Sequence, residues 1–321
     1  MPSLQARLLR AVLRLLIKRN LERHRRDTAD LIAAMRRYFE LGEPAQRRVP
    51  ADVRVVPVDS GGVRGEWVLR RDVDVDAARR GILYTHGGGM VACRPLGYRT
   101  ITIPLARATG VPVFVPDYRR APEHRFPAAL DDAVAAYDAM RLRLPPEGIA
   151  LAGDSAGGNL ALATLLALRR RGEPRPVAAV VALSPWTDLE GTGDSVTRNE
   201  RSDDMLVGSL GETKLALAYA DAAQLRDPLV SPLYGEYAGG PPLLVFASTI
   251  EMLLDDATRL ADRARAQGVQ VTLVLEEGMP HVWPIFPMLP EARAAIATIA
   301  AFLESAWQAA NASVASTGGT R

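Results

Sequence analysis

The feature that most constrains this chain is the pentapeptide Gly153-Asp154-Ser155-Ala156-Gly157, which directly follows an apolar run at residues 149–152. A serine placed in this pattern at the end of a strand requires the chain to turn sharply into a helix. The turn forces Ser155 into a strained backbone conformation, and glycines on both sides remove the Cβ atoms that would clash. The sequence therefore predicts a serine hydroxyl held above the end of a strand, with the first turn of a helix beneath it.

A second signal is His86-Gly87-Gly88-Gly89, which follows the strand-like run of residues 81–85. Glycines let backbone N–H groups approach a bound oxygen closely. Such donors stabilise the negative charge that develops when a nucleophile attacks a carbonyl, and the N–H of Ala156 would act with them. The two motifs together predict acyl transfer, with the oxyanion bound by the loop at residues 87–89 and by Ala156.

Apolar, β-rich runs alternate with helical patterns along the chain. The expected strands are residues 53–58, 66–69, 81–85, 111–116, 149–152, 177–183, 243–247 and 269–275. From the third strand onward, helical patterns occur at residues 98–109, 127–142, 159–171, 255–267 and 290–308. Continuous apolar strands that alternate with helices indicate a mostly parallel sheet covered on both faces. We therefore predict an α/β fold with an open, eight-stranded sheet that begins with an antiparallel hairpin.

Two segments interrupt this alternation. Residues 1–48 are helical and basic, and residues 190–225 are polar and then helical, between the sixth and seventh strands. We expect both to lie over the C-terminal edge of the sheet as a helical cap. The α/β core would then consist of residues 49–189 and 226–309, and the small, polar residues 310–321 would form a disordered tail.

The composition excludes several other classes of protein. The net charge of +2 is too small to indicate a nucleic-acid partner. No run approaches the ~18 apolar residues of a membrane span. The four histidines and the single cysteine, Cys93, lack the spacing of metal ligands, so we expect neither a metal nor a cofactor. A single cysteine excludes an internal disulfide and fits a reducing compartment, which leads us to predict a cytoplasmic location.

The segment of residues 4–21 mixes leucines with basic residues. Its apolar stretches are too short and too interrupted for the core of a signal peptide. We interpret the segment as an amphipathic helix. Two roles remain open for it: the helix packs against its own protein, or it binds the surface of a membrane.

Serine needs a base within hydrogen-bond reach to act as a nucleophile at neutral pH, and that base needs an orienting acid. In chains with this serine turn, the acid and then a histidine follow later in the sequence. Of the four histidines, His281 alone lies after the last expected strand. Glu251, Asp255 and Asp256 follow the seventh strand and are the candidates for the acid. Glu251 lies nearest to the strand end, whereas the two aspartates suit the N-terminus of the next helix.

These motifs, in this order, resemble the hormone-sensitive-lipase-like family of α/β-hydrolases, the bacterial carboxylesterases with an H-G-G-G motif. The resemblance covers residues 80–300 and includes residues 117–129, the stretch Ser184-Pro185-Trp186-Thr187-Asp188-Leu189 and the sequence Gly278-Met279-Pro280-His281. It implies an α/β-hydrolase fold with a helical cap. It also assigns the oxyanion hole to Gly88, Gly89 and Ala156.

The resemblance further implies a serine esterase in which Ser155 attacks the ester, His281 transfers protons and Glu251 orients the histidine. Many members of the family have D-x-L-x-D at the acid position, whereas this chain has Glu251-Met252-Leu253-Leu254-Asp255. Asp255 therefore remains an alternative to Glu251. His86, Asp154 and the stretch of residues 117–123 look structural by the same resemblance.

By resemblance, the substrates are esters with short to medium acyl chains, held in a small apolar pocket under the cap. Candidates for the pocket walls are Met90, Val91, Met205, Leu206, Trp283 and Phe286. A homodimer through the last strand or a nearby helix is expected by analogy alone. The alternatives are an N-acyl or amide deacylase with the same triad, a lipase-like hydrolase, and an inactive ligand-binding receptor, which the complete triad disfavours.

Overall fold

A single sheet of eight strands runs through the part of the chain that the computed structural model describes, which is residues 1–60, 62–173 and 175–318. The strands are β1 (Val53–Ser60), β2 (Val63–Arg70), β3 (Gly81–Thr85), β4 (Val113–Pro116), β5 (Ile149–Asp154), β6 (Ala179–Leu183), β7 (Leu243–Ser248) and β8 (Val271–Glu276). Their order across the sheet is β1-β2-β4-β3-β5-β6-β7-β8. The pairs β1–β2 and β2–β4 are antiparallel, and the other pairs are parallel. The predicted fold class and its antiparallel start are confirmed.

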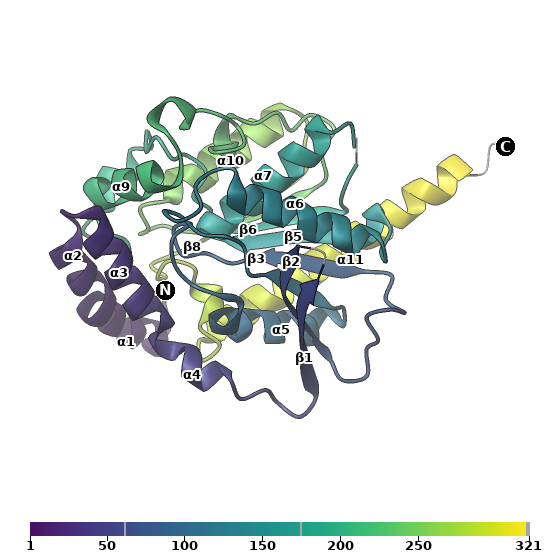
Figure 1. Cartoon of the computed structure of the whole chain (residues 1–321), viewed down its shortest axis with the longest axis horizontal. Helices are drawn as coiled ribbons and strands as arrows, with labels where there is room; N and C mark the ends of the chain where they lie inside the picture. Colours follow the sequence, from purple (N-terminus) through teal and green to yellow (C-terminus); the bar gives the residue numbers. More distant parts are fainter. Residues whose placement is uncertain (61, 174, 319–321) are drawn as a thin grey trace.

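Helices cover both faces of this sheet (Figure 1). Helices α6 (Ala128–Arg141), α7 (Ala156–Arg170) and α10 (Leu254–Ala266) lie on one face, and α5 (Arg99–Thr109) and α11 (Pro290–Gly318) lie on the other. Strands β3, β5, β6 and β7 are buried at every position. Successive side chains of a strand point to opposite faces, so Leu83 joins the core beneath α6 and α7 while Tyr84 joins the core beneath α5 and α11.

The N-terminal arm contains α1 (Leu4–Leu13), a π-helical turn (Arg14–Lys18), α2 (Arg19–His24), α3 (Thr28–Phe39) and α4 (Glu43–Gln46). The segment between β6 and β7 contains α8 (Ser195–Arg198) and α9 (Ser209–Tyr219). Although far apart in sequence, α3 and α9 pack against each other at one side of the sheet (Figure 1). Among the described residues, no helix is both long enough and apolar enough to cross a bilayer.

The structure describes most of the segment expected to be a disordered tail as part of a helix. Helix α11 continues to Gly318, beyond the expected end at residue 308. Alanine is the strongest helix former, and Ala306, Ala309, Ala310 and Ala312 extend a helix that the buried Trp307 anchors to the core. Residues 319–321 of the expected tail lie outside the described residues.

Candidate active site

Ser155 lies between the end of β5 and the start of α7, with φ +51° and ψ −123°. Its backbone N–H donates to the carbonyl oxygen of Leu183 at 2.8 Å, which fixes the turn to the neighbouring strand. Glycine is required at Gly157, because a Cβ atom there would collide with the carbonyl oxygen of Thr85. The local geometry is therefore the strained strand-to-helix turn that the pentapeptide predicts.

His281 lies in the loop after β8 and Glu251 in the loop after β7, and their side chains contact each other. Nδ1 of His281 and Oε2 of Glu251 are 2.7 Å apart. The other carboxylate oxygen of Glu251 accepts the backbone N–H of Ser248 at 2.7 Å. Glu251 is fully buried and His281 is 4% exposed, so solvent competes little for either side chain. The histidine ring is thus held in one orientation by a carboxylate, as a general base requires.

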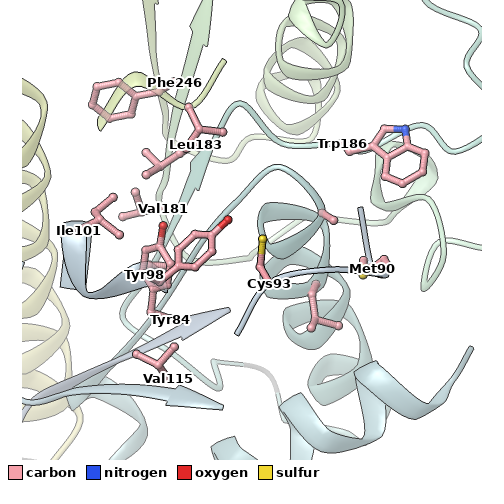
Figure 2. Close-up of a cluster of buried hydrophobic side chains, with 14 of the residues drawn as sticks. Tyr84, Met90, Cys93, Tyr98, Ile101, Val115, Val181, Leu183, Trp186 and Phe246 are labelled. Atoms are coloured by element: carbon pink, nitrogen blue, oxygen red, sulfur yellow. The ribbon is translucent and has the colours of Figure 1, made fainter. Parts of the chain in front are cut away.

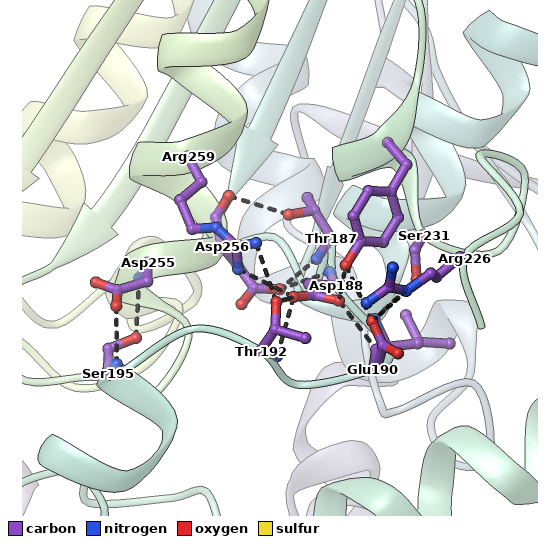
Figure 3. Close-up of polar contacts among 12 residues, drawn as sticks. Thr187, Asp188, Glu190, Thr192, Ser195, Arg226, Ser231, Asp255, Asp256 and Arg259 are labelled. Carbon is purple, nitrogen blue, oxygen red and sulfur yellow. Dashed lines mark hydrogen bonds and ion pairs between the residues drawn. The ribbon is translucent and has the colours of Figure 1, made fainter. Parts of the chain in front are cut away.

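The two aspartates that sequence left open as acids do not contact His281. Both lie in the first turn of α10. Asp255 accepts the backbone N–H of Ser195 at 2.9 Å (Figure 3). Asp256 accepts two backbone N–H groups from the turn after β6, at 2.7 and 2.8 Å. Of the three candidates, the structure brings Glu251 alone to the histidine within the described residues.

The second ring nitrogen of His281, Nε2, is buried and has no hydrogen-bond partner among the described residues. His281 and Ser155 line the same cavity. Burial lowers the pKa of His281, but the hydrogen bond and the charge of Glu251 outweigh it, so that the net pKa is raised above 6.5. The site thus combines a serine with a histidine whose free nitrogen can take a proton.

Backbone donors lie beside the serine. Gly88 and Gly89 have φ values of +110° and +63°, which other residues rarely adopt. The carbonyl oxygen of Gly88 accepts the N–H of Ala92 at 2.9 Å and turns the loop back on itself. In the described part of the chain, no acceptor engages the N–H groups of Gly88 and Gly89. Ala156 opens α7, and an N–H in the first turn of a helix has no partner within that helix.

Asp154, within the pentapeptide, braces the glycine loop. Its carboxylate accepts hydrogen bonds from Tyr84 and Tyr98 at 2.8 and 3.0 Å and from the N–H of Gly87 at 3.2 Å. The rings of Tyr84 and Tyr98 belong to the same buried cluster as Cys93 (Figure 2). Burial raises the pKa of Asp154 to about 6, against the opposing effect of the tyrosine hydrogen bonds. These contacts support the structural role expected for Asp154.

His86 also holds the loop. Its ring stacks on Tyr118 at a centroid distance of 4.2 Å, and the Tyr118 hydroxyl donates to the carbonyl oxygen of His86 at 2.7 Å. Burial lowers the pKa of His86 to about 3, so the ring is neutral at physiological pH. Further along the same stretch, Glu123 binds Arg36 of the N-terminal arm through two contacts of 2.7 Å. Residues 117–123 therefore connect the glycine loop to the arm.

The turn after β6 is fixed by a buried polar cluster (Figure 3). Asp188 is fully buried and pairs with Arg259 at 3.0 Å. Burial raises the pKa of Asp188, but hydrogen bonds from Thr192 and Arg259 outweigh it and the net pKa is lowered. Burial raises the pKa of the neighbouring Asp256 to about 8. The cluster ties α10 to the turn after β6, near the end of the loop that carries Glu251.

A largely apolar cavity of about 250 Å³ adjoins Ser155. Three of the six predicted wall residues line it, namely Met205, Leu206 and Phe286. Most of the apolar wall residues that sequence reasoning missed come from the N-terminal arm, from α9 and from the loops after β7 and β8, and include Leu13, Ile17, Met35, Tyr38, Phe39, Leu215, Leu253 and Ile285. The apolar periodicity of the arm indicated a buried face but not the cavity that this face covers.

The other three predicted wall residues, Met90, Val91 and Trp283, do not line the cavity. All three are at most 1% exposed. The Trp283 ring packs against Phe246 at 5.9 Å, because the loop turns the side chain back into the core. Met90 lies in the core behind the glycine loop (Figure 2), where Val91 also packs. Proximity in sequence to the glycines and to His281 was therefore a poor guide to these walls.

Glu43 is a polar wall residue that sequence reasoning also missed. One of its carboxylate oxygens, Oε2, pairs with Arg94 at 2.7 Å. Its Oε1 is buried and has no hydrogen-bond partner among the residues that the structure describes. Among the described residues that line the cavity, Oε1 of Glu43 and Nε2 of His281 are the buried side-chain polar atoms left free. No group of three or more metal-ligating side chains occurs in the described residues.

A mostly parallel sheet with a serine after one strand, an acid after a later strand and a histidine after the last strand defines the class of α/β-hydrolases. The family profile described as the alpha/beta hydrolase fold matches residues 82–285. Fold, site and profile therefore agree on the class of protein.

Known relatives narrow this class. The chain is 40% identical over 275 residues to an acetyl-hydrolase of Streptomyces hygroscopicus, covering 85% of this chain and 87% of the relative. It is 34% identical over 255 residues to an esterase of Acinetobacter venetianus, covering 79% and 82%. A crystal structure of an esterase from the bacterial hormone-sensitive lipase family matches with a TM-score of 0.79 and 40% identity, covering 89% of this chain and 96% of that one. The chain belongs to the hormone-sensitive-lipase-like carboxylic ester hydrolases of the α/β-hydrolase family, as its motifs predicted.

Proposed function

We propose that this carboxylic ester hydrolase works through a triad of Ser155, His281 and Glu251. The observation that carries the proposal is the 2.7 Å contact between His281 and Glu251, beside a serine in a strained turn. Oγ of Ser155 attacks the ester carbonyl while Nε2 of His281 takes its proton. His281 then gives the proton to the departing alcohol, which leaves the acyl group on Ser155.

Water completes the reaction. His281 takes a proton from the water that attacks the acyl carbon, and returns it to Ser155 as the acid departs. The N–H groups of Gly88, Gly89 and Ala156 bind the oxyanion in both steps. Donors of this kind each contribute roughly 10²- to 10³-fold in kcat. No metal or cofactor takes part in this proposal.

The acyl group would occupy the cavity beside Ser155. Its volume of about 250 Å³ and its apolar lining support esters with short to medium acyl chains. The arm at residues 1–48 and the segment at residues 190–225 would act as the cap, because both contribute side chains to the cavity wall. A cap of this kind excludes water from the acyl group and controls entry.

A second candidate is hydrolysis of N-acetyl amides by the same triad. The relative from Streptomyces is named an acetyl-hydrolase, and that name does not specify an ester.

The cytoplasmic location and the homodimer stay predictions. The single buried thiol of Cys93 supports the first, and analogy alone supports the second.

Hydrolysis of 4-nitrophenyl esters from acetyl to palmitoyl tests the proposal, with wild type and Ser155→Ala side by side. We expect the rate to peak at short to medium chains and to disappear in the variant. Activity in a folded Ser155→Ala protein would contradict the mechanism. Faster hydrolysis of 4-nitroacetanilide than of 4-nitrophenyl acetate would favour the amide candidate.

A further inference from the structure

The N-terminal helix has two apolar faces, and the protein covers one of them. The inner face contributes Ala6, Leu13 and Leu21 to the core. Five large side chains on the opposite face are about half exposed or more, namely Leu4 (65%), Leu8 (61%), Val12 (48%), Leu15 (58%) and Leu16 (54%). Their spacing of three or four residues places them along one stripe of the helix, which we call the outer leucine face.

This arrangement differs from the rest of the described surface. The other exposed large apolar residues are scattered over separate elements, namely Met1, Leu41, Val56, Leu142, Leu217, Leu275 and Met288. Single exposed apolar side chains are ordinary, whereas a contiguous apolar stripe marks a surface that binds a partner. The outer leucine face is therefore a candidate docking surface.

Positive charge accompanies this face. Residues 1–26 contain seven arginines and one lysine against one glutamate, although the whole chain carries a net charge of only +2. Arg10 and Arg14 are occupied, because both pair with Asp204, at 2.5 and 2.8 Å. Lys18 is also occupied, since it donates to the carbonyl oxygen of Asp203 at 2.7 Å.

Arg25 is occupied as well, because it pairs with Glu200 at 3.1 Å. The other four arginines of this segment form no ion pair with any described residue: Arg7, Arg19 and Arg23 on the helix, and Arg26 just beyond it. Arg7 adjoins Leu8 in sequence, and Arg19 follows Leu15 by one helical turn. The partner should therefore offer a continuous apolar layer together with negative charge.

We propose that the outer leucine face docks on the surface of an anionic lipid bilayer. The leucines would enter the boundary between headgroups and acyl chains, and the free arginines would bind lipid phosphates. The alternative occupant is a second copy of this chain. A two-fold contact across this face would bring together two positively charged helices, and the repulsion between them would oppose dimerisation. An anionic bilayer, by contrast, offers both an apolar layer for the leucines and negative charge for the arginines.

Docking in this orientation has a consequence for the site. Leu13 and Ile17, on the inner side of the same helical segment, line the cavity beside Ser155. The bound helix would lie between the lipid surface and the cavity, so apolar esters that partition into the membrane would be concentrated next to the cavity wall. The inference itself does not depend on the catalytic roles proposed above, because binding is measured without turnover.

Sedimentation of the full chain with vesicles tests the proposal. We compare phosphatidylcholine vesicles with vesicles that also contain phosphatidylglycerol. The chain should bind more strongly to the anionic vesicles, and added salt should weaken this binding. Combined substitution Leu8→Ser, Val12→Ser and Leu15→Ser should lower the affinity at least roughly tenfold. Leu142→Ser, at a side chain that is 87% exposed on another element, is the matched control and should bind like wild type.

Two further measurements identify the occupant. Arg7→Gln, Arg19→Gln and Arg23→Gln together should remove the preference for phosphatidylglycerol. Hydrolysis of soluble 4-nitrophenyl acetate by the leucine variant should match wild type and shows that the variant is folded. A wild-type chain that does not sediment with anionic vesicles would overturn the proposal. A dimeric wild type together with a monomeric leucine variant, as measured by their masses in solution, would also overturn the proposal. This result would assign the outer leucine face to a second copy of the chain.

Discussion

Nδ1 of His281 lies 2.7 Å from Oε2 of Glu251, although the two residues are 30 positions apart in sequence. Helix α10 and strand β8 occupy the chain between them. The contact therefore exists only because β7 and β8 are neighbouring parallel strands whose C-terminal loops meet at one edge of the sheet. It leaves Nε2 as the ring nitrogen with no hydrogen-bond partner in the described part of the chain, next to the cavity that Ser155 also lines.

The first prediction separates the two candidate acids. Glu251→Gln keeps the shape of the side chain but removes the charge that orients and stabilises the protonated histidine. We expect kcat to fall roughly 10³- to 10⁴-fold. Asp255→Asn should leave kcat nearly unchanged, because Asp255 binds Ser195 and Arg198 at 2.9 and 3.1 Å and does not contact the histidine. Steady-state kinetics on 4-nitrophenyl butyrate check both variants, and the opposite pattern would move the acid to Asp255.

The second prediction concerns pH. His281 must be neutral to accept a proton, so kcat/KM should fall as the pH drops through its pKa. Burial lowers this pKa, but Glu251 raises it by a larger amount. The midpoint on the acidic side of the pH profile of kcat/KM should therefore lie above 6.5. In Glu251→Gln the two largest raising effects are lost, while burial and the weaker charges of Asp203 and Asp154 remain, so the midpoint of the residual activity should move to lower pH. The same midpoint in both proteins would exclude Glu251 as the partner.

The third prediction tests the glycine loop. At Gly89, with φ +63°, an added Cβ would lie 3.1 Å from Met35 and 3.3 Å from Leu215. Gly89→Ala should displace the N–H donor and lower kcat roughly 10²-fold. Gly110 is the matched control, because its φ is +70° and no atom of the described residues lies within 4 Å of an added Cβ. Gly110→Ala should cost about 1 kcal/mol of stability from strain and leave kcat intact. Equal kinetic effects in the two variants would argue against the oxyanion role.

The fourth prediction compares two buried aspartates that are neighbours. Asp188 is ionised and paired with Arg259, so Asp188→Asn should lower the free energy of unfolding by about 2 kcal/mol at neutral pH. Asp256 has a pKa raised to about 8 by burial, so it carries a proton at neutral pH. Asparagine resembles this neutral form, and Asp256→Asn should change stability by less than about 1 kcal/mol. Urea unfolding of both variants measures the difference.

The pH dependence of unfolding provides an independent check on Asp256. The folded state holds its proton up to about pH 8, whereas the unfolded chain releases it near the ordinary value of 3.8. The folded state therefore binds more protons between these values, and this group lowers stability as pH rises through that window. Asp256→Asn should remove this contribution. An unchanged slope in the variant would mean that Asp256 is ionised in the fold.

The sequence was sufficient for elements whose geometry is local. The turn at Ser155 follows from glycines within two residues of it, and the strands follow from apolar runs that are buried on both faces. The residues of the cavity wall were harder to predict, because they depend on which segments, far apart in sequence, pack together in the fold. The periodicity of the arm indicates a buried face at Leu13 and Ile17, but no local signal tells that this face covers the cavity. Trp283 is the opposite kind of error. It lies two positions from His281 in sequence and was therefore expected in the cavity wall, but its side chain points into the core.

The most direct test of the mechanism is covalent labelling with diethyl 4-nitrophenyl phosphate, followed by mass spectrometry of peptides. The reagent transfers its phosphoryl group to an activated serine and releases 4-nitrophenolate. We expect one equivalent of 4-nitrophenolate per chain, a diethylphosphoryl group on Ser155, no labelling of Ser155→Ala and much slower labelling of His281→Ala. Stoichiometric labelling of another residue, or full esterase activity in a chain labelled at Ser155, would contradict the account.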